Sequence, residues 1–98
     1  MTSRPKNRYE IYDDFCIGYT TNTNKPFYFD KEHLTALQQY EWIERKNGKV
    51  VTPTEKKHRA LSLASIVYPR ISGYIINFKN RSENDIRSAN ILIESVRE

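Results

Sequence analysis

The sequence YEIYDDFCIGY runs from Tyr9 to Tyr19 and is followed, after a loop of Thr and Asn residues, by PFYFD from Pro26 to Asp30. In both stretches apolar or aromatic residues alternate with polar ones, which is typical of strands that bury one face. The acidic pair Asp13-Asp14 divides the first stretch into two segments and predicts a hairpin. The chain is therefore expected to open with three short antiparallel strands.

A helix is predicted to follow these strands, from Asp30 to Tyr40. Aspartate is a favoured residue at the N-cap, and Glu32 places a negative charge in the first turn, where the helix dipole favours it. Leu34, Leu37 and Tyr40 recur at three-residue spacing, so all three are expected to face the core.

The strongest hairpin signal in the chain is Asn47-Gly48, which joins two predicted strands at residues 41–46 and 49–52. Trp42 is the expected core anchor of this unit. A second helix is predicted over residues 54–68.

The last third of the chain begins with a β-branched and aromatic run from Tyr74 to Phe78, which predicts a strand. A loop at 80–84, a short helix at 85–90 and a final strand or helix end at 91–96 are expected to follow. This order describes an α+β fold: one small domain over residues 8–98, preceded by a flexible basic arm at residues 1–7.

Length and composition exclude several classes of protein. With 98 residues the chain has no room for a second catalytic domain, and a single cysteine, Cys16, rules out a multi-bridge disulfide scaffold. No apolar run reaches the ~20 residues that a membrane span needs, and the first residues lack the apolar segment of a signal peptide. We therefore expect a protein of the reducing cytoplasm, without a membrane partner.

The net charge of +4 is unevenly distributed. Residues 9–44 carry seven acidic and two basic residues, a net charge of −5, whereas residues 45–59 carry six basic residues and one acidic residue, a net charge of +5. A basic stretch of this kind fits a phosphate backbone, although it is also typical of a solvated hairpin that only maintains solubility.

The order of features in the first half resembles the N-terminal half of small HNH homing endonucleases from phages and mobile elements. That order is a hairpin, the FYFD strand, a helix, and the sequence WIERKNGKV from Trp42 to Val50. The second half is similar to the nuclease core of the same family through Leu63–Val67, Gly73–Asn80 and Asp85–Ile91. The resemblance covers about residues 7–93 and implies a degenerate HNH core of the ββα-metal type.

Departures from the family pattern fall on the chemistry. The resemblance implies a divalent metal held by two side chains, with a His as the general base that activates water. Phe78 occupies the position of that base, and Ala64 replaces the His of the upstream helix. Asn77 and Asn90 occupy the ligand positions, and two amides without a carboxylate hold Mg²⁺ weakly. We therefore expect no catalytic residue, metal or other cofactor, and a binding protein in place of an enzyme.

Two sets of charged residues are the expected binding surfaces. The set expected to bind nucleic acid is basic and comprises Arg45, Lys46, Lys49, Lys56, Lys57, Arg59, Lys79 and Arg81. The set expected to bind a protein is acidic and comprises Asp13, Asp14, Asp30, Glu32, Glu41 and Glu44. An ordinary solvated face is the alternative interpretation of the acidic set.

Together these features predict a catalytically inactive HNH-like protein of phage type in the cytoplasm of the host cell. Its expected partner is a host nuclease effector or the nucleic acid of that effector, with direct binding to DNA as a further option. The most concrete form of this hypothesis is an inhibitor of a host nuclease defence system, of the anti-CRISPR type. The alternative is a Mg²⁺-dependent HNH endonuclease with a relocated general base. The sequence leaves the oligomeric state open.

Overall fold

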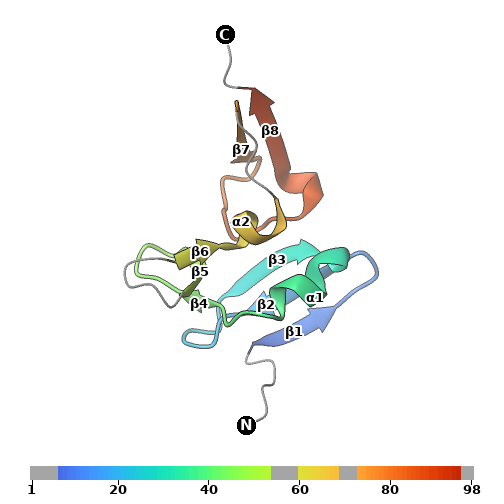
Figure 1. The fold of residues 1–98 in the computed structure, drawn as a ribbon. Helices are drawn as coiled ribbons and strands as arrows, with labels where there is room; N and C mark the ends of the chain where they lie inside the picture. The colour runs from blue at the N-terminus through green and yellow to red at the C-terminus, as the bar shows by residue number, and fades with distance from the viewer. Residues whose placement is uncertain (1–6, 54–59, 69–72, 96–98) are drawn as a thin grey trace.

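The three predicted N-terminal strands form one sheet. In the computed structural model, which describes residues 7–53, 60–68 and 73–95, β1 (Arg8–Ile11), β2 (Phe15–Tyr19) and β3 (Pro26–Asp30) pair antiparallel in that order (Figure 1). Cys16 lies opposite Phe29 in the register, and Gly18 lies opposite Phe27. Because alternate residues share a face, Cys16, Phe27 and Phe29 all point inward, and all three are fully buried.

The helix predicted at 30–40 is shorter than expected. A 3-10 turn, η1 (Lys31–His33), leads into a single helical turn, α1 (Leu34–Leu37). Leu37 is fully buried, as predicted, but Tyr40 is 38% exposed, so its predicted place in the core is wrong. The helix ends before Tyr40, and the Tyr40 ring packs instead against the edge of the core, 5.9 Å from the ring of Trp42.

The second sheet contains β4 (Ile43–Glu44), β5 (Val50–Pro53) and β6 (Ala60–Ser62). The Asn47-Gly48 hairpin is confirmed between shorter strands, with Gly48 at φ +86°, where glycine is favoured. The helix predicted over 54–68 is wrong at residues 60–62, which pair with β5. Of residues 60–68, only α2 (Leu63–Val67) is helical. Ser62 caps the start of this helix by accepting a hydrogen bond from the Ser65 amide (3.3 Å). Residues 54–59 of the predicted helix lie outside the described residues.

Trp42 is the core anchor that the sequence indicated. Its ring is fully buried, and its indole N–H donates to the Leu37 carbonyl (2.9 Å). The side chain of Asn7 accepts from the Trp42 amide (2.9 Å) and donates to the carbonyls of Trp42 (2.9 Å) and Tyr19 (2.8 Å). Asn7 is therefore part of the folded domain, which begins at least one residue earlier than the sequence indicated.

The third sheet is the antiparallel pair β7 (Tyr74–Phe78) and β8 (Ile91–Ser95). The strand interpretation of residues after 90 is confirmed, whereas the predicted helix at 85–90 is reduced to one 3-10 turn, η2 (Ser88–Asn90). Asp85 and Ile86 are not helical, because their backbones pair with Tyr28 of the first sheet.

The segment before η2 completes the edge of the first sheet. Tyr28 donates its amide to the Asn84 carbonyl (2.8 Å), and the Ile86 amide donates to the Tyr28 carbonyl (2.8 Å), which gives a parallel bridge between Tyr28 and Asp85. Ile86 is fully buried in the same core cluster as Phe27, Leu37 and Trp42.

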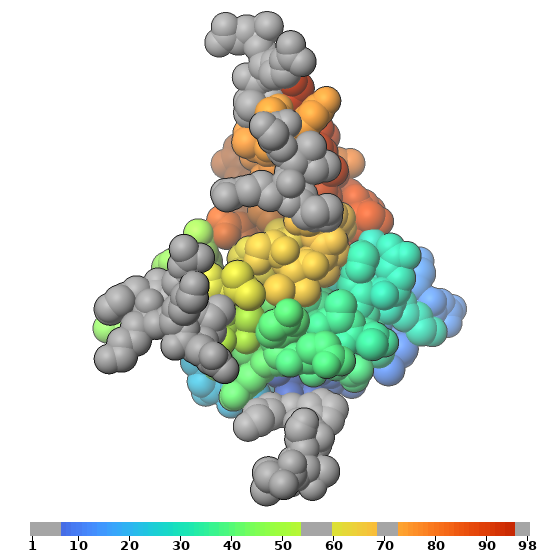
Figure 2. Space-filling model, in the orientation of Figure 1, coloured from blue at the N-terminus to red at the C-terminus, as the bar shows by residue number. Residues whose placement is uncertain are grey.

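The first two sheets, α1 and α2 make up the body, and the β7–β8 hairpin extends away from it (Figures 1 and 2). The α+β class is thus confirmed in its coarse form, as three small antiparallel sheets with short helices. Among the described residues, no helix has the length and the apolar character that a membrane span needs.

Candidate functional site: a basic surface and an acidic cleft

Two positions that the family resemblance assigns to histidines lie against the core. Phe78 at the end of β7 and Ala64 in α2 are both partly buried and pack on the core cluster. Asn77 points to the opposite face of β7, as alternation requires, and its exposed amide donates to Glu94 on β8 (2.6 Å). Phe78 and Asn77 therefore face opposite sides of the hairpin.

Asn90 holds the loop between β7 and β8 together. Its side chain is 8% exposed, donates to the Asn80 side chain (2.9 Å) and the Asp85 carbonyl (2.7 Å), and accepts from the Asn80 amide (2.9 Å). Both polar atoms of this amide are committed to backbone and loop partners. Sequence patterns could not predict this arrangement, because every partner lies in an irregular loop.

Asp85 and Arg87 form a bidentate ion pair beside this loop. Arg87 donates to the buried Asp85 carboxylate through Nε (2.8 Å) and Nη2 (2.6 Å), and its guanidinium lies 5.3 Å from the centre of the Tyr28 ring. Burial raises the pKa of Asp85, but hydrogen bonds and charge from Arg87, with a further hydrogen bond from Asn80, hold it below its usual value. Asp85 precedes the 3-10 turn η2, whose N-cap residue is Arg87.

The basic turn between β4 and β5 is anchored by Asn84. Its side-chain oxygen accepts from the Val50 amide (3.0 Å), and its side-chain nitrogen donates to the Gly48 carbonyl (2.9 Å). The turn is closed by hydrogen bonds between the backbones of Arg45 and Lys49 (2.9 Å) and of Gly48 and Arg45 (2.8 Å). The turn is therefore fixed against the loop that follows β7.

That loop carries two further cations of the predicted set. Lys79 and Arg81 are both exposed, and Lys49 on the opposite turn forms an ion pair with Glu83 (3.3 Å). Arg81 adopts φ +64°, a left-handed conformation that is costly for a residue with a side chain. The loop residues between β7 and η2 thus bring the basic turn and this second basic segment together.

We call this the basic surface, defined by the five exposed cations Arg45, Lys46, Lys49, Lys79 and Arg81. The other three predicted members, Lys56, Lys57 and Arg59, lie outside the described residues.

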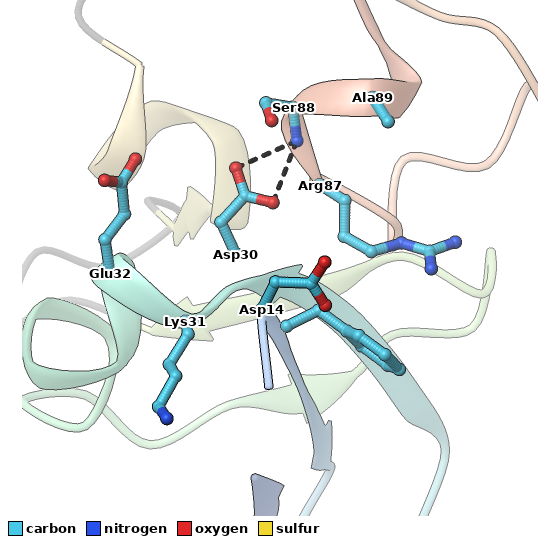
Figure 3. A pocket seen from close by; sticks show the side chains of 8 residues that line it. Asp14, Asp30, Lys31, Glu32, Arg87, Ser88 and Ala89 are labelled. Carbon is cyan, nitrogen blue, oxygen red and sulfur yellow. Dashed lines mark hydrogen bonds between the residues drawn. The ribbon is translucent and has the colours of Figure 1, made fainter. Parts of the chain in front are cut away.

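An acidic cleft lies at the junction of the body and the η2 turn. It has a volume of about 530 Å³, and its lining includes Asp14, Asp30, Glu32 and Arg87. Figure 3 shows the Asp30 carboxylate reaching the backbone of Ser88, with Lys31 pointing away. The Ser88 amide donates to both oxygens of Asp30 (3.0 and 3.2 Å), so the cap role predicted for Asp30 is replaced by a bond across 58 residues.

Beside the cleft, a carboxylate from Asp30, one from Glu32 and the imidazole of His33 place a possible ligand atom each within 4.8 Å of one another. Such donors suit a divalent cation chemically. These ligand atoms already have partners within the protein. The Asp30 carboxylate accepts from the Ser88 amide, and Oε2 of Glu32 lies 3.4 Å from Nε2 of His33. The sequence analysis did not single out this group. Its only signal was that Asp30, Glu32 and His33 fall within four consecutive residues.

The predicted acidic set does not form one surface. Asp14, Asp30 and Glu32 line the cleft, and Asp13 is exposed in the adjacent turn. The remaining two acids lie elsewhere and bond to the loop after β2: Glu41 accepts from Thr21 (2.9 Å), and Glu44 accepts from Thr23 (2.5 Å) and pairs with Lys25 (3.7 Å).

Comparison with protein-family models, with curated proteins and with solved structures returned no match for this chain.

Proposed function

We propose that this protein is a non-catalytic binding module on an HNH-like scaffold and that its basic surface contacts the phosphate backbone of a nucleic acid. The observation that carries the proposal is the double hydrogen bond of Asn84 to the β4–β5 turn. The β4–β5 turn and the loop after β7, each of which carries predicted cations, are thereby held next to each other. Phosphate contacts of Lys and Arg position a protein on nucleic acid without requiring base recognition.

The strain at Arg81 supports this assignment. A left-handed conformation costs about 1–2 kcal/mol for a residue other than glycine, and such residues concentrate at functional sites. The side chain at this strained position is cationic and exposed.

Binding should therefore be strongly dependent on salt. With five phosphates neutralised, the logarithm of the binding constant falls with the logarithm of salt concentration with a slope of about −4.5 for duplex DNA, so affinity drops about 10²- to 10³-fold between 50 and 200 mM salt. Fluorescence anisotropy with a labelled duplex and a single strand measures this slope.

The charge-reversal variant R45E/K49E should weaken binding at least about tenfold at 50 mM salt. The matched control is Lys31→Glu, which reverses an exposed cation beside the acidic cleft and should change binding less than about threefold. If no salt-sensitive binding is measured, or if both variants weaken it equally through net charge alone, the basic surface is not the binding site.

A second candidate is the inhibition of a host nuclease complex, of the anti-CRISPR type, through the acidic cleft. Three carboxylates around a cleft offer a complementary surface for the positively charged channel that holds nucleic acid in such effectors. A buried free thiol, Cys16, fits the reducing cytoplasm in which this partner would be met. Glu32→Lys, at a 75% exposed side chain, should abolish co-purification with the effector if the cleft is the contact, whereas Glu41→Lys should not.

The endonuclease alternative is tested by plasmid nicking with Mg²⁺ or Mn²⁺. Asn90→Ala is a poor catalytic knock-out because it removes three hydrogen bonds of the loop. Asn77→Ala changes an exposed side chain at the other family ligand position and keeps the loop intact. Nicking by the wild-type protein that disappears in Asn77→Ala would overturn the non-catalytic proposal.

A further inference from the structure

Exposed apolar side chains of the described residues gather on the β7–β8 hairpin. Seven large hydrophobic residues are exposed in the described part of the chain, and four of them belong to this hairpin: Tyr74, Ile75, Leu92 and Ile93. They lie on both faces, because Tyr74 and Ile93 point to one side and Ile75 and Leu92 to the other. Among the described residues, both faces of this hairpin therefore leave apolar side chains uncovered.

The hairpin also has two open edges among the described residues. β7 and β8 pair with each other and with no further described strand. A two-stranded hairpin is marginally stable in water, and its unpaired amides and carbonyls are a template for another strand. The end near Phe78 and Ile91 packs on the core, whereas the end near Tyr74 extends away from the body (Figure 1).

The direction of the backbone groups on β8 follows from one bond. The Lys79 amide donates to the Asn90 carbonyl (2.8 Å), next to the Phe78–Ile91 pair. Antiparallel pairs alternate between bonded and non-bonded types, so Asn77–Leu92 is bonded and Ile76–Ile93 is not. The amide and carbonyl of Ile93 consequently point away from β7, toward the open edge.

We propose that a second copy of this chain pairs antiparallel with β8 across a two-fold axis at Ile93, giving a four-stranded sheet. Ile93 is the residue that fits this axis: at 53% it is the most exposed of the four, and both its backbone groups face outward. An antiparallel strand centred on one residue is its own complement, since Ile93 then exchanges two hydrogen bonds with its symmetry mate.

Charge is compatible with this register. Glu94, the one charged residue of β8, falls opposite Leu92 of the second copy and not opposite its own mate, so no like charges face each other. Ile93 of both copies then extends the apolar row that Ile76 begins on one face. On β7 the corresponding residue, Ile76, is already half-buried, which makes β8 the edge that gains more from pairing.

Pairing through the few residues around Ile93 buries less than the ~800 Å² per partner of a standard interface, so the dimer is expected to dissociate in the micromolar range. Sedimentation equilibrium of the full chain at about 5–500 µM should show a monomer–dimer transition. A chain that stays monomeric over this range overturns the proposal, and so does one that assembles beyond the dimer.

The decisive variant is Ile93→Lys, which places two ammonium groups opposite each other at the axis and should weaken dimerisation at least tenfold. Its matched control is Ile75→Lys, at an equally exposed position of β7, where the new cation faces Glu94 within the same hairpin. Ile75→Lys should dimerise as the wild type does. Because the two residues lie on opposite faces, equal loss in both variants would mean that association is not specific to the edge of β8, and would overturn edge pairing. Far-UV circular dichroism verifies that both variants fold.

A cross-link provides a second measurement that does not depend on weakening the dimer. Ile93→Cys brings two thiols together at the axis, where paired Cα atoms lie ~5.5 Å apart, within the range of a disulfide. Mild oxidation should give a covalent dimer for Ile93→Cys and none for Ile75→Cys. The native Cys16 does not interfere, because it is fully buried and burial raises the pKa of its thiol. The dimer does not rest on nucleic-acid binding, so either proposal can fail without the other.

Discussion

The N-terminal sheet and the β7–β8 hairpin are built from similar sequences but are stabilised differently. Both consist of short alternating strands rich in aromatic and β-branched residues. In the first sheet, Phe27 and Phe29 are covered by Leu37, Trp42 and Leu63, whereas the hairpin leaves apolar residues exposed on both faces. An alternating pattern therefore predicts that a strand forms, but it does not predict whether anything covers the strand.

The largest expected effect separates the two regions directly. Phe29→Ala removes a fully buried ring and should lower the free energy of unfolding by about 3–5 kcal/mol, because a cavity is left in the core. Leu92→Ala, at a 42% exposed side chain, should change it by less than about 0.5 kcal/mol. Urea denaturation of the two variants measures the difference. Similar losses would mean that the hairpin is as well covered as the core.

A tight contact within the first sheet gives the next effect. A Cβ on Gly18 would lie 2.6 Å from Cε2 of Phe27 on the neighbouring strand, and Phe27 is held by the core. Gly18→Ala should therefore cost about 3 kcal/mol through overpacking. Gly48→Ala is the control for glycine loss without a contact, since nothing lies within 4 Å of its added Cβ, although its positive φ adds a cost of about 1 kcal/mol. An equal loss in the two variants would contradict the steric explanation.

The Asp85–Arg87 pair links the two regions, and its loss should be intermediate. Arg87→Ala leaves a buried carboxylate without its cation; because Arg87 itself is 39% exposed, we expect about 2 kcal/mol rather than the 3–5 kcal/mol of a fully buried pair. Thermal unfolding near pH 6 measures this loss. Asp85→Asn/Arg87→Leu, which removes both charges, is the control and should lose less.

The same pair predicts the dependence of stability on pH. The pKa of Asp85 is lowered in the folded protein, so its contribution is fully present above the unfolded value near 3.8 and is lost as the pH falls through the folded value. Arg87→Ala removes the hydrogen bonds and the charge of the guanidinium, so the pKa of Asp85 should be higher in this variant than in the wild type. The stability difference between wild type and Arg87→Ala should thus shrink between about pH 6 and pH 3; a constant difference would contradict the ion-pair account.

The smallest effect concerns the basic surface. Arg81→Gly relieves a left-handed conformation, so the free energy of unfolding should stay the same or rise by up to about 1 kcal/mol, while nucleic-acid binding at 50 mM salt weakens several-fold. Arg81→Asn removes the charge but introduces a residue that readily adopts the left-handed backbone conformation. It should weaken nucleic-acid binding as much as Arg81→Gly does. Loss of stability in Arg81→Gly would mean that the arginine side chain supports the loop.

Local patterns predicted the first sheet because each strand carries its own alternation and its own turn. They failed at residues 60–62, where pairing with β5 overrides a helical pattern, and at Tyr40, where the helix ends too early to bring the ring inward. Asp30 was assigned to a local cap because its partner, the Ser88 amide, is 58 residues away. Sequence spacing carries no information on contacts of that length.

In the candidate site, too, local features could be predicted from the sequence and contacts between distant segments could not. The exposure of Arg45, Lys46 and Lys49 could be predicted from a polar turn, and Lys79 and Arg81 from a loop. That the turn and the loop lie next to each other could not be predicted, because it depends on the side chain of Asn84, which has no distinctive sequence context. Likewise the acidic set looked uniform in sequence, but the fold places Glu41 and Glu44 against a different loop from Asp30.

The placement of Ile86 has a consequence for how this chain matures on the ribosome. The open edge of β3 and the hole in the core that Ile86 fills are both closed by residues 84–88, which are synthesised after the rest of the body. Until they emerge from the exit tunnel, the nascent N-terminal half has an unpaired strand and an unfilled interior. We therefore expect the domain to fold only after residues 84–88 have left the tunnel, and a fragment truncated before residue 84 to be degraded rather than accumulate.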